Sequence, residues 1–291
     1  MTETALTRER VGDNAWQRFW NRGGWWKTAL LVVVYLAVYE GLGFVVQSLF
    51  ADFIDTDDLF GSPLTIFFAL AVPILLMGLL LLAFVRSLGW QGEIFGRQPV
   101  DGRGWMWVVV VLILVPIVIR LFAVTWSAYS VTVVFSALFL GLCVGLAEEL
   151  LTRGVATNLL RRAGYTERVV FVLSSLVFAL LHSINVLSGQ PAIAVAVTVV
   201  YTFGFGAMMY LSMLATGRIV WAMLLHAATD PVTFLATGGI DAHGSTSGDA
   251  ALLSIASIFN YAYILAALVA IVLVKGKVYP DRSPRRKVSA A

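Results

Sequence analysis

The chain has 291 residues, of which 59% are hydrophobic and 13% are charged. A soluble globular domain carries about 25% charged residues, so this composition excludes an ordinary soluble enzyme and predicts an integral membrane protein. The net charge of +3 does not indicate a nucleic-acid partner, because the basic residues stand between apolar runs and not on a solvated domain face. The single cysteine, Cys143, excludes an intrachain disulfide framework and a multi-cysteine metal site.

Eight apolar segments are long enough to cross a bilayer as helices, since about 20 residues span its hydrocarbon core. Their predicted bounds are 26–50, 63–85, 105–123, 131–151, 169–187, 192–214, 220–235 and 252–274. We therefore expect an all-α fold, a polytopic membrane bundle of about eight transmembrane helices. The membrane domain covers residues 26–274, between a basic N-terminal segment, 1–25, and a basic tail, 275–291.

The basic residues predict the orientation of the bundle. Apart from Arg120, every Lys and Arg falls in the N-terminal part up to Lys27, in an even-numbered loop or in the C-terminal tail. The first loop, 51–58, is acidic and has no basic residue. Since Lys and Arg are enriched in cytoplasmic loops, we expect both termini in the cytoplasm, which agrees with an even number of spans.

Few ionisable side chains lie inside the predicted spans. A carboxylate at the centre of a membrane helix costs about 2.5–3.5 kcal/mol on insertion scales, so each such residue is a candidate functional group. The candidates are Glu40, Glu148, Glu149, His182, His226 and Asp230. Glu40 stands in no motif and is expected to be a polar group that faces the bundle. His243, in the loop 239–250, is given no role.

Helical spacing separates the two adjacent glutamates. Glu149 and Arg153 are four residues apart, so they share a helix face and are expected to form a pair. Glu148 points elsewhere and is left free for chemistry. With the fourth span ending at 151, Glu148 would lie only a few Å from the cytoplasmic surface. It can meet the histidines only if the helix continues past Arg153, as far as Arg162.

These side chains favour hydrolysis by an activated water. A carboxylate beside a histidine can deprotonate water, and a second polar pair can stabilise an oxyanion. The same residues, Glu148, His182, His226 and Asp230, also match the ligand preferences of a divalent metal such as zinc, so a metal cofactor stays open. Each group also has a purely structural interpretation. Glu148 and Glu149 could lie at a helix end that emerges among the lipid headgroups, and His182 could be a core histidine bonded to the backbone.

Three short motifs occur in order along the chain: Glu148-Glu149-x-x-x-Arg153, Phe178-x-x-x-His182 and His226-x-x-x-Asp230. Together they resemble the motifs of the CPBP family of intramembrane endopeptidases, also called the Abi family. This family contains type II CAAX prenyl proteases and bacteriocin-processing proteins. The resemblance covers roughly residues 131–237, the motif-bearing core.

The resemblance implies a role for each motif residue. Glu148 would be the general base on water, assisted by His182. Glu149 and Arg153 would be a structural or substrate-carboxylate-facing pair.

The third motif would supply the oxyanion-stabilising pair, His226 with Asp230. Two positions depart from the family pattern. Thr152 stands where the family often has Phe, which we expect to be a lipid-facing or packing change. The family has Asn or Asp at position 230. An ionised Asp230 cannot donate a hydrogen bond to an oxyanion, so it would be protonated, orient His226 or help to bind a metal.

The resulting hypothesis is an endopeptidase of a bacterial plasma membrane, with a water-filled cavity open to the cytoplasm. Its partners would be membrane lipids and a hydrophobic or lipidated peptide substrate. Two alternatives stay open. One is a non-catalytic family member that acts in bacteriocin self-immunity or as a membrane scaffold. The other is a proton-coupled transporter, against which stands the absence of a repeat in the sequence.

Overall fold

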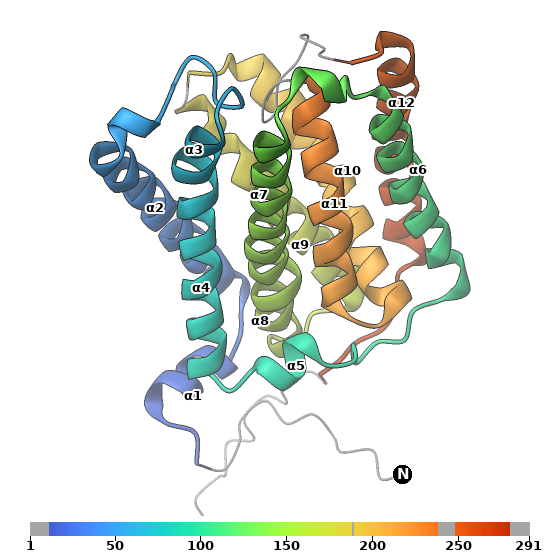
Figure 1. Cartoon of the computed structure of the whole chain (residues 1–291). Helices are drawn as coiled ribbons and strands as arrows, with labels where there is room; N and C mark the ends of the chain where they lie inside the picture. Colours follow the sequence, from blue (N-terminus) through green and yellow to red (C-terminus); the bar gives the residue numbers. More distant parts are fainter. Residues whose placement is uncertain (1–11, 188, 238–247, 280–291) are drawn as a thin grey trace, which may run out of the picture.

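The computed structural model describes residues 12–187, 189–237 and 248–279 (Figure 1). Within these ranges the regular elements are helices, with one isolated bridge between Val124 and Gly248. Eight of them have the length and hydropathy of membrane spans, which confirms the predicted fold class. Residues 1–11 of the N-terminal segment, most of the tail and His243 lie outside the described residues.

Several spans combine more than one type of helix. Their bounds are α2 Trp25–Leu49; α3 Pro63–Thr65, η2 Ile66–Ala71 and α4 Val72–Ser87; η3 Gly104–Met106 and α6 Trp107–Ala123; α7 Val131–Glu149, η5 Leu150–Ala156 and α8 Thr157–Arg162; α9 Glu167–Leu181 and η6 His182–Val186; α10 Ala192–Thr216; α11 Ile219–Thr237; α12 Ala250–Leu273. The shorter elements are α1 Ala15–Asn21, η1 Ala51–Phe53, α5 Gln91–Phe95 and η4 Trp126–Ala128.

The fourth span does not end at residue 151, as predicted. It continues through η5 and α8 to Arg162. The π-helical turn η5 widens the helix around Thr152, whose carbonyl accepts hydrogen bonds from the hydroxyls of Thr157 and Ser174, both at 3.0 Å. Hydroxyl groups commonly satisfy backbone groups where a membrane helix is irregular. The extension places Glu148 about 20 Å from the end of the helix and so near the middle of the bundle.

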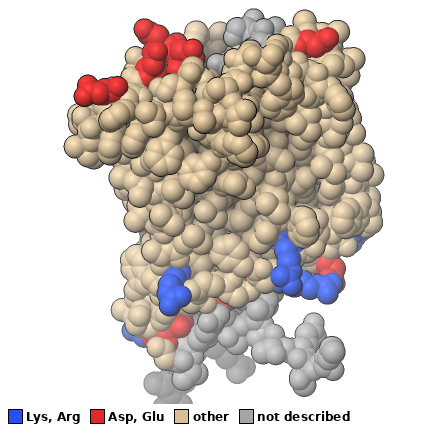
Figure 2. Space-filling view, viewed as in Figure 1, with Lys and Arg blue, Asp and Glu red and all other residues tan. Residues whose placement is uncertain are grey.

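The bundle has two distinct ends, which we call terminal and distal. At the terminal end, the start of α2 meets α8 through a Gly24 N–H to Leu159 carbonyl bond of 3.1 Å, and α1 and α5 lie nearby (Figure 1). At the distal end lie η1, η4 and η6, and Asp249 N–H donates to the carbonyl of Ala123 at 2.8 Å. On the face shown in Figure 2, Lys and Arg gather at the terminal end together with some acidic residues, whereas the charged residues visible at the distal end are acidic.

Two glycines bring α7 and α11 into close contact. A Cβ atom at Gly141 would lie 2.6 Å from Pro231 Cγ, and one at Gly145 would lie 2.5 Å from the carbonyl oxygen of Met223. This Gly-x-x-x-Gly spacing lets membrane helices approach closely. The contact holds Glu148 and Glu149, at the end of α7, against His226 on α11.

Buried ion pairs occupy the terminal half. Arg161 bonds to Glu167, and its Nη1 also donates to Gln98 Oε1 at 2.8 Å. Arg162 Nη2 lies 2.5 Å from Glu93 Oε2. Both arginines are almost fully buried, so their charges are compensated inside the protein.

Candidate active site

Glu149 lies at the centre of a buried polar group. Its Oε1 is 3.1 Å from Arg153 Nη1 and 2.8 Å from His226 Nδ1, and neither carboxylate nor guanidinium is exposed. The predicted pair with Arg153 is therefore present. An ionised carboxylate at this distance keeps a proton on Nδ1, so the hydrogen bond orients the imidazole ring.

Arg153 is held within the protein through both Nη atoms, while its Nε is buried without a hydrogen-bond partner among the described residues. Besides Glu149, it donates to the carbonyl of Gly206 at 2.6 Å and to Thr152 Oγ1 at 2.5 Å, and its guanidinium stacks 4.4 Å from the ring centre of Phe178. The side chain is 0% exposed, so it has no surface for a substrate carboxylate. Of the two roles left open for this arginine, the geometry fits the structural one.

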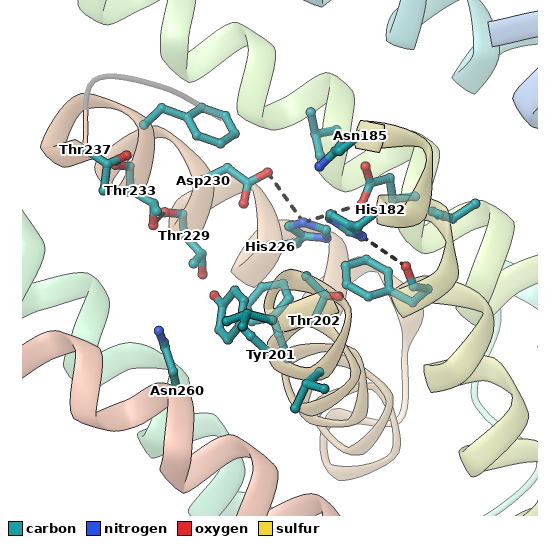
Figure 3. A pocket seen from close by; sticks show the side chains of 18 of the residues that line it. His182, Asn185, Tyr201, Thr202, His226, Thr229, Asp230, Thr233, Thr237 and Asn260 are labelled. Atoms are coloured by element: carbon teal, nitrogen blue, oxygen red, sulfur yellow. Dashed lines mark hydrogen bonds and ion pairs between the residues drawn. The ribbon is translucent and has the colours of Figure 1, made fainter. Parts of the chain in front are cut away.

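Glu148 and Asp230 flank the other nitrogen of His226. Its Nε2 lies 3.4 Å from Asp230 Oδ2 (Figure 3) and 4.0 Å from Glu148 Oε2, while Nδ1 is held by Glu149. The side chain of Glu148 is 19% exposed, in contrast to Glu149 at 0%. One imidazole therefore joins a buried carboxylate behind it to two accessible carboxylates in front of it.

His182 begins η6 and lies in the same part of the cavity as His226 (Figure 3). Its Nδ1 is 3.1 Å from the carbonyl of Phe178, which can accept a hydrogen bond only from a protonated Nδ1. Nε2 then remains available to the cavity. The ring of Phe178 packs against both histidines. The distance between ring centroids is 5.2 Å to His182 and 5.7 Å to His226. The hydrogen bond to the backbone that was expected for a core histidine is thus present, and it fixes the orientation of this imidazole.

A cavity of about 890 Å³ opens in front of these groups, a volume typical of ligand sites. Its deepest polar residues are Glu148 and His226, and its walls reach Thr237 and Ala250 at the distal end. The lining thus lies in the middle and distal half of the bundle, opposite the end that carries the basic residues. The expectation of a cytoplasmic cavity is therefore inconsistent with cytoplasmic termini.

A row of threonines continues the polar wall from the histidine toward the distal end. Thr229, Thr233 and Thr237 follow His226 at helical spacing, and their hydroxyls donate to carbonyls of their own helix at 2.8–2.9 Å. Figure 3 shows all three on the side of α11 that also carries Asp230. The sequence contained this signal, because the positions repeat with the same period as the motif residues.

Other cavity residues come from outside the motif-bearing core and belong to no motif in the sequence. They include Tyr35 and Tyr39 of α2, Arg120 of α6 and Asn260 of α12. Among the described residues, the Tyr35 hydroxyl and Asn260 Oδ1 are buried without a hydrogen-bond partner. Polar groups in this condition are expected where a ligand or water binds.

Of the two expectations for Thr152, the packing change fits the structure. Thr152 is fully buried and does not face lipid, and its hydroxyl donates to the carbonyl of Glu148 at 2.6 Å and accepts from Arg153. The expectation for Glu40 is wrong. Glu40 is exposed on α2, does not line the cavity and does not face the bundle.

A metal site is not assembled in the part of the chain that the structure describes. No group of three or more His, Cys, Asp or Glu side chains there has an arrangement that could hold a metal ion. The possible ligands Glu148, His182, His226 and Asp230 therefore do not form the tetrahedral set that zinc prefers.

Comparison with protein families matches residues 129–232 to the model described as type II CAAX prenyl endopeptidase Rce1-like. The match contains all three motifs and leaves out the first three spans and the last. No curated protein and no solved structure is similar enough to the chain to count as a match. With eight apolar helices and this match, the chain is an integral membrane protein whose residues 129–232 match the Rce1-like family of membrane proteases, as the motifs predicted.

Proposed function

We propose that the protein is an intramembrane endopeptidase that hydrolyses a peptide bond of a membrane-associated or lipidated peptide. The observation that carries the proposal is the contrast between neighbouring carboxylates. Glu149 is buried and bonds to Nδ1 of His226, while Glu148 faces the cavity 4.0 Å from Nε2 of the same ring, which Asp230 also flanks at 3.4 Å. This is the arrangement that a general base and an oxyanion stabiliser require.

The reaction begins with a water held by Glu148 and His182 in the cavity. Glu148 takes a proton from the water as the oxygen attacks the carbonyl carbon of the scissile bond, and negative charge develops on the carbonyl oxygen. His226, with both ring nitrogens protonated, donates from Nε2 to that oxygen. When the C–N bond breaks, the proton on Glu148 passes to the leaving amine.

Asp230 acts through His226 and not directly on the oxyanion. Its Oδ2 lies 3.4 Å from Nε2, within range to stabilise a charged imidazole by electrostatic attraction. This role removes the difficulty that an ionised aspartate has no proton to donate. It is the second of the three roles that the sequence left open.

The charge distribution supports a bacterial plasma membrane protein with its terminal end in the cytoplasm. The distal cavity then faces the opposite side of the membrane, from which the substrate would enter. A single-cysteine variant, Thr237→Cys in a Cys143→Ser background, tests this placement. A membrane-impermeant maleimide should label it in intact cells, and labelling only after permeabilisation would reverse the orientation.

The function itself is tested by cleavage of membrane-tethered peptides with purified protein in liposomes. The wild type should release fragments detectable by mass spectrometry, Glu148→Gln should not, and Glu40→Gln is the matched control on an exposed face. Cleavage that survives Glu148→Gln undiminished would refute the assignment. A chelator added to the wild type tests whether a metal contributes.

The alternatives predict different outcomes of the same experiment. A non-catalytic scaffold or immunity protein would leave every peptide intact. A proton-coupled carrier would instead give substrate-dependent proton uptake into liposomes that Glu148→Gln abolishes.

A further inference from the structure

Arg120 is an intramembrane cation in the wall of the cavity that the mechanism does not use. It lies on α6 near the distal end, on the same helix face as Ile113 and Ile117. All three are buried, at 8%, 0% and 6% exposure, whereas Phe122 on the outer face is 78% exposed. Arginines that snorkel from a helix end point toward the membrane surface, but this one points into the bundle.

The guanidinium of Arg120 has neither a hydrogen bond nor an ion pair with any residue that the structure describes. The other buried arginines of that part of the chain differ. Arg153 is paired with Glu149, Arg161 with Glu167 and Arg162 with Glu93. The guanidinium nitrogens of Arg120 are not among the buried side-chain atoms that lack a partner, so they are open to the cavity, where an external anion would compensate the charge.

The surroundings of Arg120 suit one end of an amphiphilic molecule. Arg120 lines the same cavity as Glu148 and His226, among mostly apolar walls. It lies three residues from the distal end of α6, and His226 lies eleven residues from the distal end of α11. At 1.5 Å per residue, the two are separated by about 12 Å along the bundle. A molecule held at Arg120 therefore extends toward the candidate catalytic groups.

We propose that Arg120 is an anion subsite that binds the carboxylate or phosphate group of the amphiphile in the cavity. Its first candidate ligand is a carboxylate of the peptide substrate, and in this respect the inference rests on the proposed function. Arg153 cannot provide this contact, because its guanidinium is enclosed and paired. A guanidinium matches carboxylate and phosphate oxygens by paired hydrogen bonds.

The test measures binding without turnover, in the Glu148→Gln background. A hydrophobic dansyl-labelled peptide is prepared with a free C-terminal carboxylate and as the C-terminal amide, and its fluorescence anisotropy is titrated with protein in phosphatidylcholine vesicles. The acid should bind about tenfold or more tightly than the amide, since charge-assisted hydrogen bonds have this strength. Arg120→Gln should remove the difference, and Arg120→Lys should keep part of it.

A second arm distinguishes a lipid phosphate from the peptide carboxylate. The amide peptide is titrated in vesicles with and without phosphatidylglycerol. If a lipid phosphate occupies the subsite, phosphatidylglycerol should weaken binding severalfold, and Arg120→Gln should relieve the competition. Arg218→Gln, an exposed arginine that lines neither this cavity nor the smaller terminal one, is the matched charge control.

Two differences are measured: tighter binding of the acid than of the amide, and weaker binding in the presence of phosphatidylglycerol. Either difference supports the subsite if Arg120→Gln removes it and Arg218→Gln does not. Absence of both differences with Arg120 in place overturns it, as does a difference that survives Arg120→Gln. Thermal unfolding of each variant shows that it is folded. Because no turnover is needed, a protein that cleaves no peptide can still pass or fail this test.

Discussion

The terminal and distal halves of the bundle treat the same residue type in opposite ways. In the terminal half, Arg161 and Arg162 are buried against Glu167 and Glu93, so their charges stabilise contacts between helices. In the distal half, Arg120 is buried beside a cavity with no such partner among the described residues. Burial and charge alone thus do not indicate function inside a membrane; the pairing of the charge does.

The adjacent glutamates repeat this contrast within one helical turn and give the largest expected effects. Glu148→Gln should lower the cleavage rate by about 10²–10⁴, the usual contribution of a general base, and leave thermal stability unchanged. Glu149→Gln should also destabilise the protein, by about 3–5 kcal/mol, because it leaves Arg153 buried without a countercharge. Peptide cleavage and thermal unfolding in detergent measure the two effects. Equal stability losses in both variants would contradict the division of roles.

The arginines test the comparison between the two halves directly. Arg161→Met leaves Glu167 buried without its partner and should cost about 3–5 kcal/mol of unfolding free energy. Arg120→Met removes a charge that has no hydrogen-bond or ion-pair partner among the described residues, so stability should be unchanged or raised. Urea unfolding in the same detergent measures both. A loss in Arg120→Met as large as in Arg161→Met would mean that Arg120 has a structural role.

The close contact between α7 and α11 gives a smaller expected effect. Gly145→Leu adds a side chain where a Cβ alone would lie 2.5 Å from the carbonyl of Met223. Overpacking of this kind costs about 1–3 kcal/mol and should separate Glu148 from His226, so activity should fall further than stability. Gly92→Ala, on the surface helix α5 with no neighbour within 4 Å, is the control. Full activity in Gly145→Leu would show that this contact does not position the site.

Much of the fold and the motif residues could be predicted from the sequence, because both depend on local patterns. Hydropathy over about 20 residues gave the spans, and the four-residue spacing indicated the contact between Glu149 and Arg153. The predicted end of the fourth span was wrong because Arg161 and Arg162 look like loop residues until their partners are known. Those partners, Glu93 and Glu167, belong to other segments.

The position of the cavity could not be predicted for the same reason. Its walls combine Tyr35, Arg120 and Asn260, from helices that lie far apart in the sequence and carry no motif. Only the packing of these helices shows that the space in front of Glu148 extends toward the distal end. Local spacing identifies which residues share a helix face, but not which other helices that face meets.

Photo-crosslinking tests the central claim, that the peptide is cleaved in the distal cavity, most directly. A hydrophobic peptide with a photoreactive side chain beside the scissile bond is bound to the Glu148→Gln protein, irradiated and mapped by mass spectrometry. The peptide should attach to distal cavity residues such as Tyr201 and Thr233. Attachment instead to the smaller terminal cavity, at Gly92 or Val278, would contradict the proposed site.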